Sequence, residues 1–258
     1  MKQLTRREVF AALGITTGSC VLSSCVSEQL ASVRDRKSAF PWTFARLAPD
    51  VTADRAYNHY YEGHCMYGVF KSIVSQLAEQ RGKPYESFPY DMMKYGAGGV
   101  VGWGSLCGGL NGGAAVISLF ATTENEGRLL THELFRWYEQ TALPVYLPKK
   151  AKLKIEMLQS VSNSVLCHVS VSNLCKVSGY RAFGEQHYER CARLTADMAK
   201  KTVQILNRNL AGQFAADHSL TEETKWCKTC HAKGGELENS VGEMNCSTCH
   251  SYLADKHP

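Results

Sequence analysis

The 258-residue chain is 44% hydrophobic and 21% charged, an ordinary globular composition with room for one sizeable domain and a small appendage. Its net charge of +5 is mild, and it indicates neither a nucleic-acid partner nor a strongly basic membrane patch. No segment approaches a run of about 18 uninterrupted apolar residues, so we expect no transmembrane span.

Residues 1–30 indicate export. Arg6 and Arg7 precede a modest apolar run over 9–21, an arrangement that resembles a twin-arginine signal. Leu-Ser-Ser-Cys at 22–25 is similar to a lipoprotein processing box, in which Cys25 would be acylated and would anchor the mature protein. Ordinary cleavage nearby, or a chance Arg-Arg pair before a buried helix, are the alternatives. We expect a periplasmic protein exported by the twin-arginine route, with the lipid anchor left open.

The elements predicted for residues 31–211 are mostly helices. Apolar residues three or four apart predict a helix over 52–80, and a glycine-dense loop begins at Lys94. Further helices are predicted over 107–119, 124–143 and 186–210. The alternation of Val and Ser within 155–174 fits either helix or strand. Because neither strand–helix alternation nor regularly spaced hairpins occur, the fold class is mainly α, with a helical cysteine-rich domain.

The composition changes in the C-terminal segment, residues 212–258. From Trp226 onward it is nearly without aliphatic residues, so it cannot bury enough apolar surface to fold alone. It contains Cys-x-x-Cys-His twice, at Cys227–His231 and Cys246–His250, which is the signature of covalent haem attachment. Two thiols bond each porphyrin and the adjacent histidine reaches its iron. We predict two haem c groups per chain, on Cys227, Cys230, Cys246 and Cys249 with His231 and His250, in a segment with little regular structure.

Zinc is the main alternative for these motifs, because two Cys-x-x-Cys pairs can hold a structural zinc ion. A redox dithiol of thioredoxin type would need a βαβ setting, which is absent. A histidine follows each pair and the chain carries an export pattern, and both features favour haem. Three glycines in the stretch between the motifs favour a compact loop. We therefore expect the two haems to lie close together.

Each haem iron needs a sixth ligand, and histidine lowers the reduction potential whereas methionine raises it. The candidates outside the motifs are His64, His59 and His218. His59 and His64 stand on one predicted helix, and His218 precedes the first motif and could fold back. We expect bis-His ligation, with His64 as the first candidate.

Five cysteines remain outside the signal and the haem motifs: Cys65, Cys107, Cys167, Cys175 and Cys191. They could be buried thiols, disulfides with one thiol left over, or four thiolates on a metal centre. Twin-arginine transport carries folded proteins with cofactors such as iron–sulfur clusters already inserted, whereas c-type haem is attached after crossing. The export pattern therefore favours a cluster on four of the five. Cys65, Cys107 and Cys191 are the first candidates, with Cys167 or Cys175 as the fourth.

Several blocks together resemble the split-Soret cytochromes c: GHCMYGVF at 63–70, GSLCGGLNGGAA at 104–115, CARLTADMAKKTVQILN at 191–207 and the two haem motifs. The middle blocks are also similar to cysteine-rich redox proteins marked by C–GCAxxG–C–C, with GSLCGGLNG in place of the GCAxxG element. The resemblance implies a periplasmic homodimer with two bis-His haems per chain, stacked edge to edge, and ligation that can cross between subunits. It also suggests an iron–sulfur site, such as a 2Fe–2S cluster, in the cysteine-rich domain.

We expect a di-haem cytochrome c that passes electrons between redox partner proteins, and we assign no catalytic residue. A small reductase that uses a haem or the cluster as its active centre is the alternative, and an open coordination position on a haem would distinguish it. The sequence contains no nucleophile elbow, zincin motif, phosphate loop or complete dinucleotide fingerprint.

Overall fold

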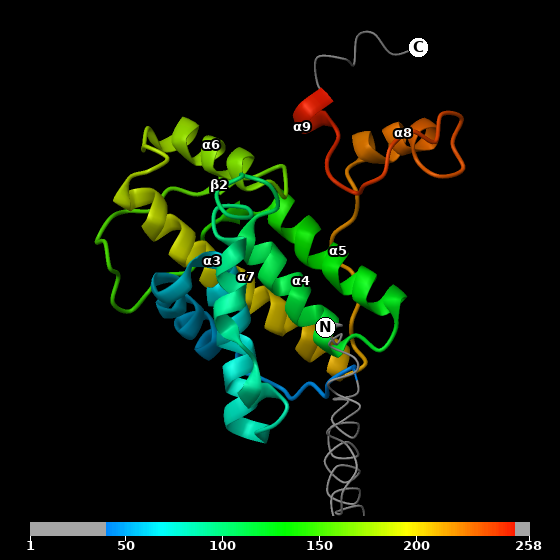
Figure 1. Cartoon of the computed structure of the whole chain (residues 1–258). Coiled ribbons are helices and arrows are strands. Elements are labelled where there is room, and N and C mark those ends of the chain that lie inside the picture. The colour runs from blue at the N-terminus through cyan, green and yellow to red at the C-terminus, as the bar shows by residue number, and fades with distance from the viewer. Residues whose placement is uncertain (1–39, 251–258) are drawn as a thin grey trace, which may run out of the picture. The chain divides into compact units, whose positions relative to one another are not determined.

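The computed structural model describes residues 40–250, and the predicted export signal with Cys25 lies outside them. The mainly α fold class is confirmed (Figure 1). The one sheet within the described residues pairs β1 (Ala142–Leu143) antiparallel with β2 (Ser160–Val161). The helical elements are α3 Pro49–Arg81, η1 Tyr85–Ser87, η2 Tyr90–Gly96, α4 Gly108–Phe120, α5 Glu124–Gln140, α6 Cys167–Ser178, α7 Glu185–Leu210, α8 Glu222–His231 and α9 Ser247–His250.

The core forms where α3 packs along α7 and α4, and α5 packs against α4 and α7 (Figure 1). Apolar side chains at helical spacing make this possible, because Val69, Ile73 and Leu77 of α3 fall on one face and are all 0% exposed. Leu194 and Met198 likewise share one buried face of α7, with 1% and 0% of their surface exposed. Each such burial stabilises the fold by about 1.5–3 kcal/mol.

Helix α3 is interrupted where the sequence predicts continuity. Gly63 and His64 leave helical geometry, and His64 has a φ of 67°, in the left-handed region. A Cβ atom at Gly63 would lie 2.4 Å from the ring of Tyr67, so glycine is required at the break. His59 and His64 therefore do not share one continuous helical face.

The glycine-dense stretch after η2 is an irregular loop, as predicted. Val100 and Val101 both have positive φ, which is unfavourable for β-branched residues. Hydrogen bonds hold the loop in this conformation, since the carbonyl of Gly99 accepts from both the N–H and the hydroxyl of Ser105, at 3.1 and 2.9 Å. The loop ends at Cys107, the N-cap of α4.

The structure resolves one ambiguous stretch and places one helix end earlier than predicted. The ambiguous stretch 155–174 contains both outcomes, since it supplies β2 and then the start of α6. Helix α5 ends at Gln140 rather than at residue 143, and β1 follows it. Pro144 disfavours helical geometry at Leu143, and the backbone is already extended at Thr141, the C-cap of α5.

From Phe40 the described residues form one compact unit. The boundary at 211/212 between a cysteine-rich domain and a haem segment stays a prediction. Across residues 40–250, no helix combines the length and the apolar character that crossing a membrane requires.

Candidate functional site

Four cysteines from separate elements line one cavity of about 540 Å³, which we call the thiol cavity. Cys65 comes from α3, Cys107 caps α4, Cys167 begins α6 and Cys191 lies on α7. All of them are free thiols, as are the other cysteines of residues 40–250. Cys175 lies two turns further along α6 and does not line this cavity.

Backbone hydrogen bonds bring Cys107 and Cys167 together. The N–H of Cys107 donates to the carbonyl of Val165 at 2.9 Å, and the N–H of Cys167 donates to Ser105 at 2.7 Å. These bonds form an isolated antiparallel bridge between Leu106 and Leu166. The glycine loop and the start of α6 are thus fixed to each other at the two thiols.

Gly108 allows Cys65 to approach the same place. A Cβ atom at this position would lie 2.4 Å from the Sγ of Cys65 and 2.3 Å from the carbonyl oxygen of Gly96. Any larger residue would push α4 away from α3. The glycine directly after Cys107 thus permits close approach of the backbone of Gly96 and the thiol of Cys65.

Burial controls the protonation of these thiols. Desolvation raises the pKa of Cys65 to about 12, with smaller contributions from the neighbouring Cys107 and Cys191 thiols. It also raises the pKa of Cys107, Cys167 and Cys191. As a set of thiols the group is therefore neutral at physiological pH, and a metal that binds there must displace protons.

The four thiols line the wall of the cavity and do not converge on a single position. Among the described residues, no three His, Cys, Asp or Glu side chains come close enough to hold one metal ion. In an iron–sulfur cluster each thiolate binds at the edge of an inorganic core, so the ligands stand further apart than around a single ion. The four cavity thiols therefore do not form a ligand set for a single ion in the described residues.

The polar residues around the thiols were not singled out from the sequence. Arg190 is 1% exposed, and its Nη2 donates to the hydroxyl of Ser170 at 2.8 Å. Tyr138 donates to the same hydroxyl at 2.8 Å and also hydrogen-bonds Cys107. The Nε2 of His187 lies 3.3 Å from the Sγ of Cys191. Helical spacing could have predicted the burial of Arg190. It stands four residues before Leu194 and eight before Met198, so it shares the buried face of α7.

The two Cys-x-x-Cys-His motifs meet at a second cavity of about 360 Å³, the haem-motif pocket. The first motif ends α8, and the second motif runs into α9. Cys227, His231, Cys246 and His250 all line the pocket, and the thiols of Cys227 and Cys246 share a hydrogen bond. Apolar side chains nearby are exposed, with Trp226 at 60%. The segment has no apolar core of its own around the motifs.

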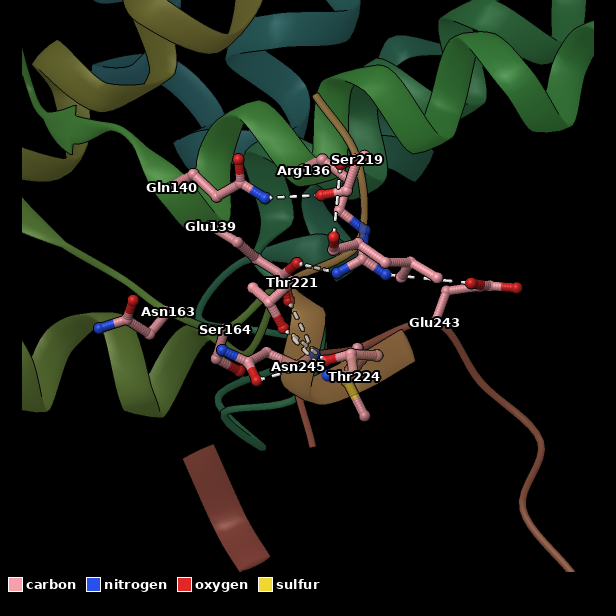
Figure 2. A network of polar contacts seen from close by, with 12 residues as sticks. Arg136, Glu139, Gln140, Asn163, Ser164, Ser219, Thr221, Thr224, Glu243 and Asn245 are labelled. Atoms are coloured by element: carbon pink, nitrogen blue, oxygen red, sulfur yellow. Dashed lines mark hydrogen bonds and ion pairs between the residues drawn. The ribbon is translucent and has the colours of Figure 1, made fainter. Parts of the chain in front are cut away.

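Polar contacts hold this pair of motifs against α5 (Figure 2). Arg136 pairs with Glu139 at 2.7 Å, and Glu139 accepts from the N–H of Asn245 at 3.4 Å. The hydroxyl of Thr224, which is 0% exposed, accepts from the N–H of Cys246 at 3.4 Å and so joins the two motif helices.

A second carboxylate of α5 holds the linker before α8. Glu133 is 1% exposed and accepts from the N–H groups of Asp217 and His218, at 2.9 and 3.0 Å. It also pairs with Lys201 and with the Nδ1 of His218, at 2.8 and 2.9 Å. Although burial alone would raise the pKa of Glu133, the hydrogen bonds from Lys201 and His218 hold it below the ordinary value of 4.5.

The predicted sixth ligands lie in different places. His64 lines the thiol cavity beside Cys65, with its ring edge-on to Tyr60. His59 pairs with Glu62 at 3.0 Å, and His218 is held by Glu133. None of the three lines the haem-motif pocket of the described chain. Their role as haem ligands stays a prediction.

Comparison with known proteins gives the family. A family model described as "Putative redox-active protein (C_GCAxxG_C_C)" matches residues 67–205, which include every cysteine of the thiol cavity except Cys65. The split-Soret cytochrome c of Desulfovibrio desulfuricans (strain ATCC 27774 / DSM 6949 / MB) is 40% identical over 223 residues, covering 84% of this chain and 80% of that protein. The chain belongs to the split-Soret cytochrome c family.

The fold agrees with a solved split-Soret cytochrome c. That structure, from Desulfovibrio desulfuricans ATCC 27774, is described as containing a novel iron centre, and it matches with a TM-score of 0.80 at 39% identity. The match covers 85% of this chain and 94% of that one. Membership of the split-Soret family identifies the chain as a redox protein of the cytochrome class.

The anchoring role of Glu133 predicts a specific response to acid. A carboxylate with a depressed folded-state pKa stabilises the fold above its unfolded pKa, and that contribution is lost as pH falls below about 4.5. We expect Glu133→Gln to reduce the free energy of unfolding by about 1–3 kcal/mol at neutral pH, since it weakens several buried hydrogen bonds. Its stability should then fall less steeply than that of the wild type as the pH drops below about 4.5.

The measurement is denaturant unfolding at several pH values, with hydrogen exchange at the amides of Asp217 and His218. Glu222→Gln is the matched control, because Glu222 is exposed and pairs only with Lys225 among the ion pairs of residues 40–250. Its effect should stay within about 0.5 kcal/mol. Equal exchange rates at the linker amides in the Glu133 variant and the wild type would contradict the anchoring role.

Proposed function

We propose that the chain is a periplasmic electron-transfer protein that carries two covalent haems and an iron–sulfur cluster. The observation that carries the proposal is the convergence of both Cys-x-x-Cys-His motifs on one pocket, in a segment with no apolar core around them. A porphyrin is a large apolar surface, and its attachment would supply the missing hydrophobic contact. Family membership supports the redox role.

The residues of the haem motifs fit that attachment. Cys227 and Cys230 are assigned to one haem, with His231 on its iron, and Cys246 and Cys249 to the other, with His250. Bound haem would supply reversible one-electron chemistry at iron. The protein itself fixes the two motif segments relative to each other. Thr224 and Asn245 do this by linking α8 to the start of α9.

The same geometry supports the proposal that the two haems lie close together. The thiols of Cys227 and Cys246 are in hydrogen-bond contact, so the first attachment points of the two motifs are neighbours. Haems bound at two such attachment points would lie side by side. A homodimer in which a second copy covers this segment is part of the proposal, with a histidine such as His64, His59 or His218 as the sixth ligand.

The thiol cavity is proposed to hold the cluster, of 2Fe–2S type, through Cys65, Cys107, Cys167 and Cys191. Four thiols line one cavity, and cysteine thiolates are the usual ligands of iron–sulfur clusters. The cavity wall contains no Asp or Glu, whereas it contains Arg190 and Lys94, so its charges suit an anionic group. The position of Cys175 outside the cavity favours Cys167 as the fourth ligand.

Periplasmic location rests on the twin-arginine pattern of residues 1–30, which lie outside the described residues. Such transport delivers a folded domain with its cluster in place, and haem attachment follows. The electrons would pass between soluble or membrane-bound redox partners, and no nucleic-acid partner is proposed.

Serine substitution tests the haem assignment. We expect Cys227→Ser together with Cys230→Ser to remove one covalent haem, and the matching pair at Cys246 and Cys249 to remove the other, because serine forms no thioether. The measurement is intact-protein mass of the mature product from a cytochrome c-maturing host, with denatured haem absorbance per chain. Two haems retained in either double variant would contradict the assignment.

Iron counting tests the cluster assignment. Substituting serine singly for Cys65, Cys107, Cys167 or Cys191 should lower non-haem iron and acid-labile sulfide several-fold, since each removes a ligand. Cys175→Ser is the matched control, because it changes the one remaining cysteine of this domain and should retain wild-type iron. Iron loss in the Cys175 variant, with none in Cys167→Ser, would reverse the choice of fourth ligand.

A further inference from the structure

The most unusual charge in the described chain is the guanidinium of Arg190. It is the largest of the fully buried side chains, and it lies at the wall of the thiol cavity. Its Nη2 reaches a neutral hydroxyl, that of Ser170, and its Nε is buried without a hydrogen-bond partner. A buried charge without an ionic partner lowers the stability of the fold by several kcal/mol unless a counterion is present.

The nearby carboxylates are already engaged. Glu189, the preceding residue, pairs with Arg193 at 2.8 Å and accepts from two tyrosine hydroxyls. Asp197, further along α7, accepts from the N–H of Val145 at 2.8 Å. No ion pair to a carboxylate involves Arg190 within residues 40–250, whereas the buried Arg136 pairs with Glu139 and Glu243, and the buried Arg193 pairs with Glu189.

The groups that do face Arg190 are the cavity's thiols and phenol. It hydrogen-bonds the side chain of Cys191, and its charge interacts most strongly with the ionised forms of Cys191, Tyr138 and Cys107. Cys167 and Asp197 also feel this charge, but Asp197 forms no ion pair with Arg190 within residues 40–250. A neutral thiol is a poor partner for a guanidinium, but a thiolate bound to iron keeps negative charge. The anion that Arg190 requires is therefore the one that a thiolate-ligated cluster would bring.

We propose that Arg190 is the counterion of the cluster in the thiol cavity and raises its reduction potential. The inference rests on the proposed cluster and goes beyond it, because it assigns a residue that is not a ligand. On reduction the cluster gains one electron from a redox partner, and the guanidinium keeps its proton and its charge. A fixed positive charge stabilises the more negative, reduced state, so it favours acceptance of the electron.

Tyr138 and Ser170 would position this charge. The hydroxyl of Ser170 accepts from both Tyr138 and Arg190, each at 2.8 Å, so it ties α5 and α7 together at the cavity wall. Tyr138 in turn hydrogen-bonds Cys107. These contacts hold the guanidinium in a fixed direction, so its effect on the cavity needs no reorganisation when the electron arrives.

The test compares Arg190→Gln, which removes the charge, with Arg190→Lys, which keeps it. Arg193→Gln is the matched control, because it removes a buried arginine three residues along α7 that does not line the thiol cavity. The full-length protein is matured with its haems. Non-haem iron per chain is then measured, and the cluster is titrated potentiometrically with EPR detection.

We expect Arg190→Gln to decrease the equilibrium constant for cluster reduction at least tenfold, ~59 mV for a one-electron couple, or to lose non-haem iron. The Lys variant and Arg193→Gln should retain both the iron and the wild-type potential. Equal behaviour of the Gln and Lys variants at position 190 would overturn the inference, and so would an equal shift in Arg193→Gln. Wild-type protein without non-haem iron would overturn the proposed cluster and this inference together, whereas an unchanged potential in a loaded Arg190→Gln would overturn the inference alone.

Discussion

The C-terminal segment must be held in place although it has almost no apolar surface to bury, and helix α5 meets this constraint. Glu133 binds the linker at residues 217–218, and Glu139 binds the backbone before the second motif. Both carboxylates are buried, so their hydrogen bonds are worth more than those of surface pairs. The segment's attachment is therefore polar and directional, which fixes its register against the helical core.

The four thiols of the thiol cavity come from distant parts of the sequence, so only the tertiary fold brings them together. The core packing of α3, α4 and α7 brings Cys65, Cys107 and Cys191 together, and the bridge at residues 106 and 166 adds Cys167. Gly108 is what permits the approach of α4 to Cys65. The arrangement of the four thiols thus depends on the same close packing that stabilises the core, so the fold preorganises the cavity.

Helix α5 touches both sites. Tyr138 belongs to the wall of the thiol cavity, while the adjacent Glu139 holds the haem segment. A single helix therefore sets the position of the thiol cavity relative to the C-terminal segment that carries the two Cys-x-x-Cys-His motifs. In an electron-transfer protein this matters, because transfer requires cofactors to stay at fixed separation rather than to meet by diffusion.

The sequence by itself determined the helical class, the position of most helices and both haem motifs, because hydrophobic spacing and the Cys-x-x-Cys-His signature are local patterns. It also identified five cysteines as a group, but it left Cys167 and Cys175 equivalent. Only the tertiary structure placed Cys167 at the cavity and Cys175 outside it, because the bridge to the glycine loop is a contact between residues about 60 positions apart. The burial of Arg190 and Glu133 was likewise decided by packing, because a charged residue on a helix is expected to face solvent until a second helix covers it. The break at Gly63 was also decided by packing, because the ring of Tyr67 leaves no room for a Cβ atom there.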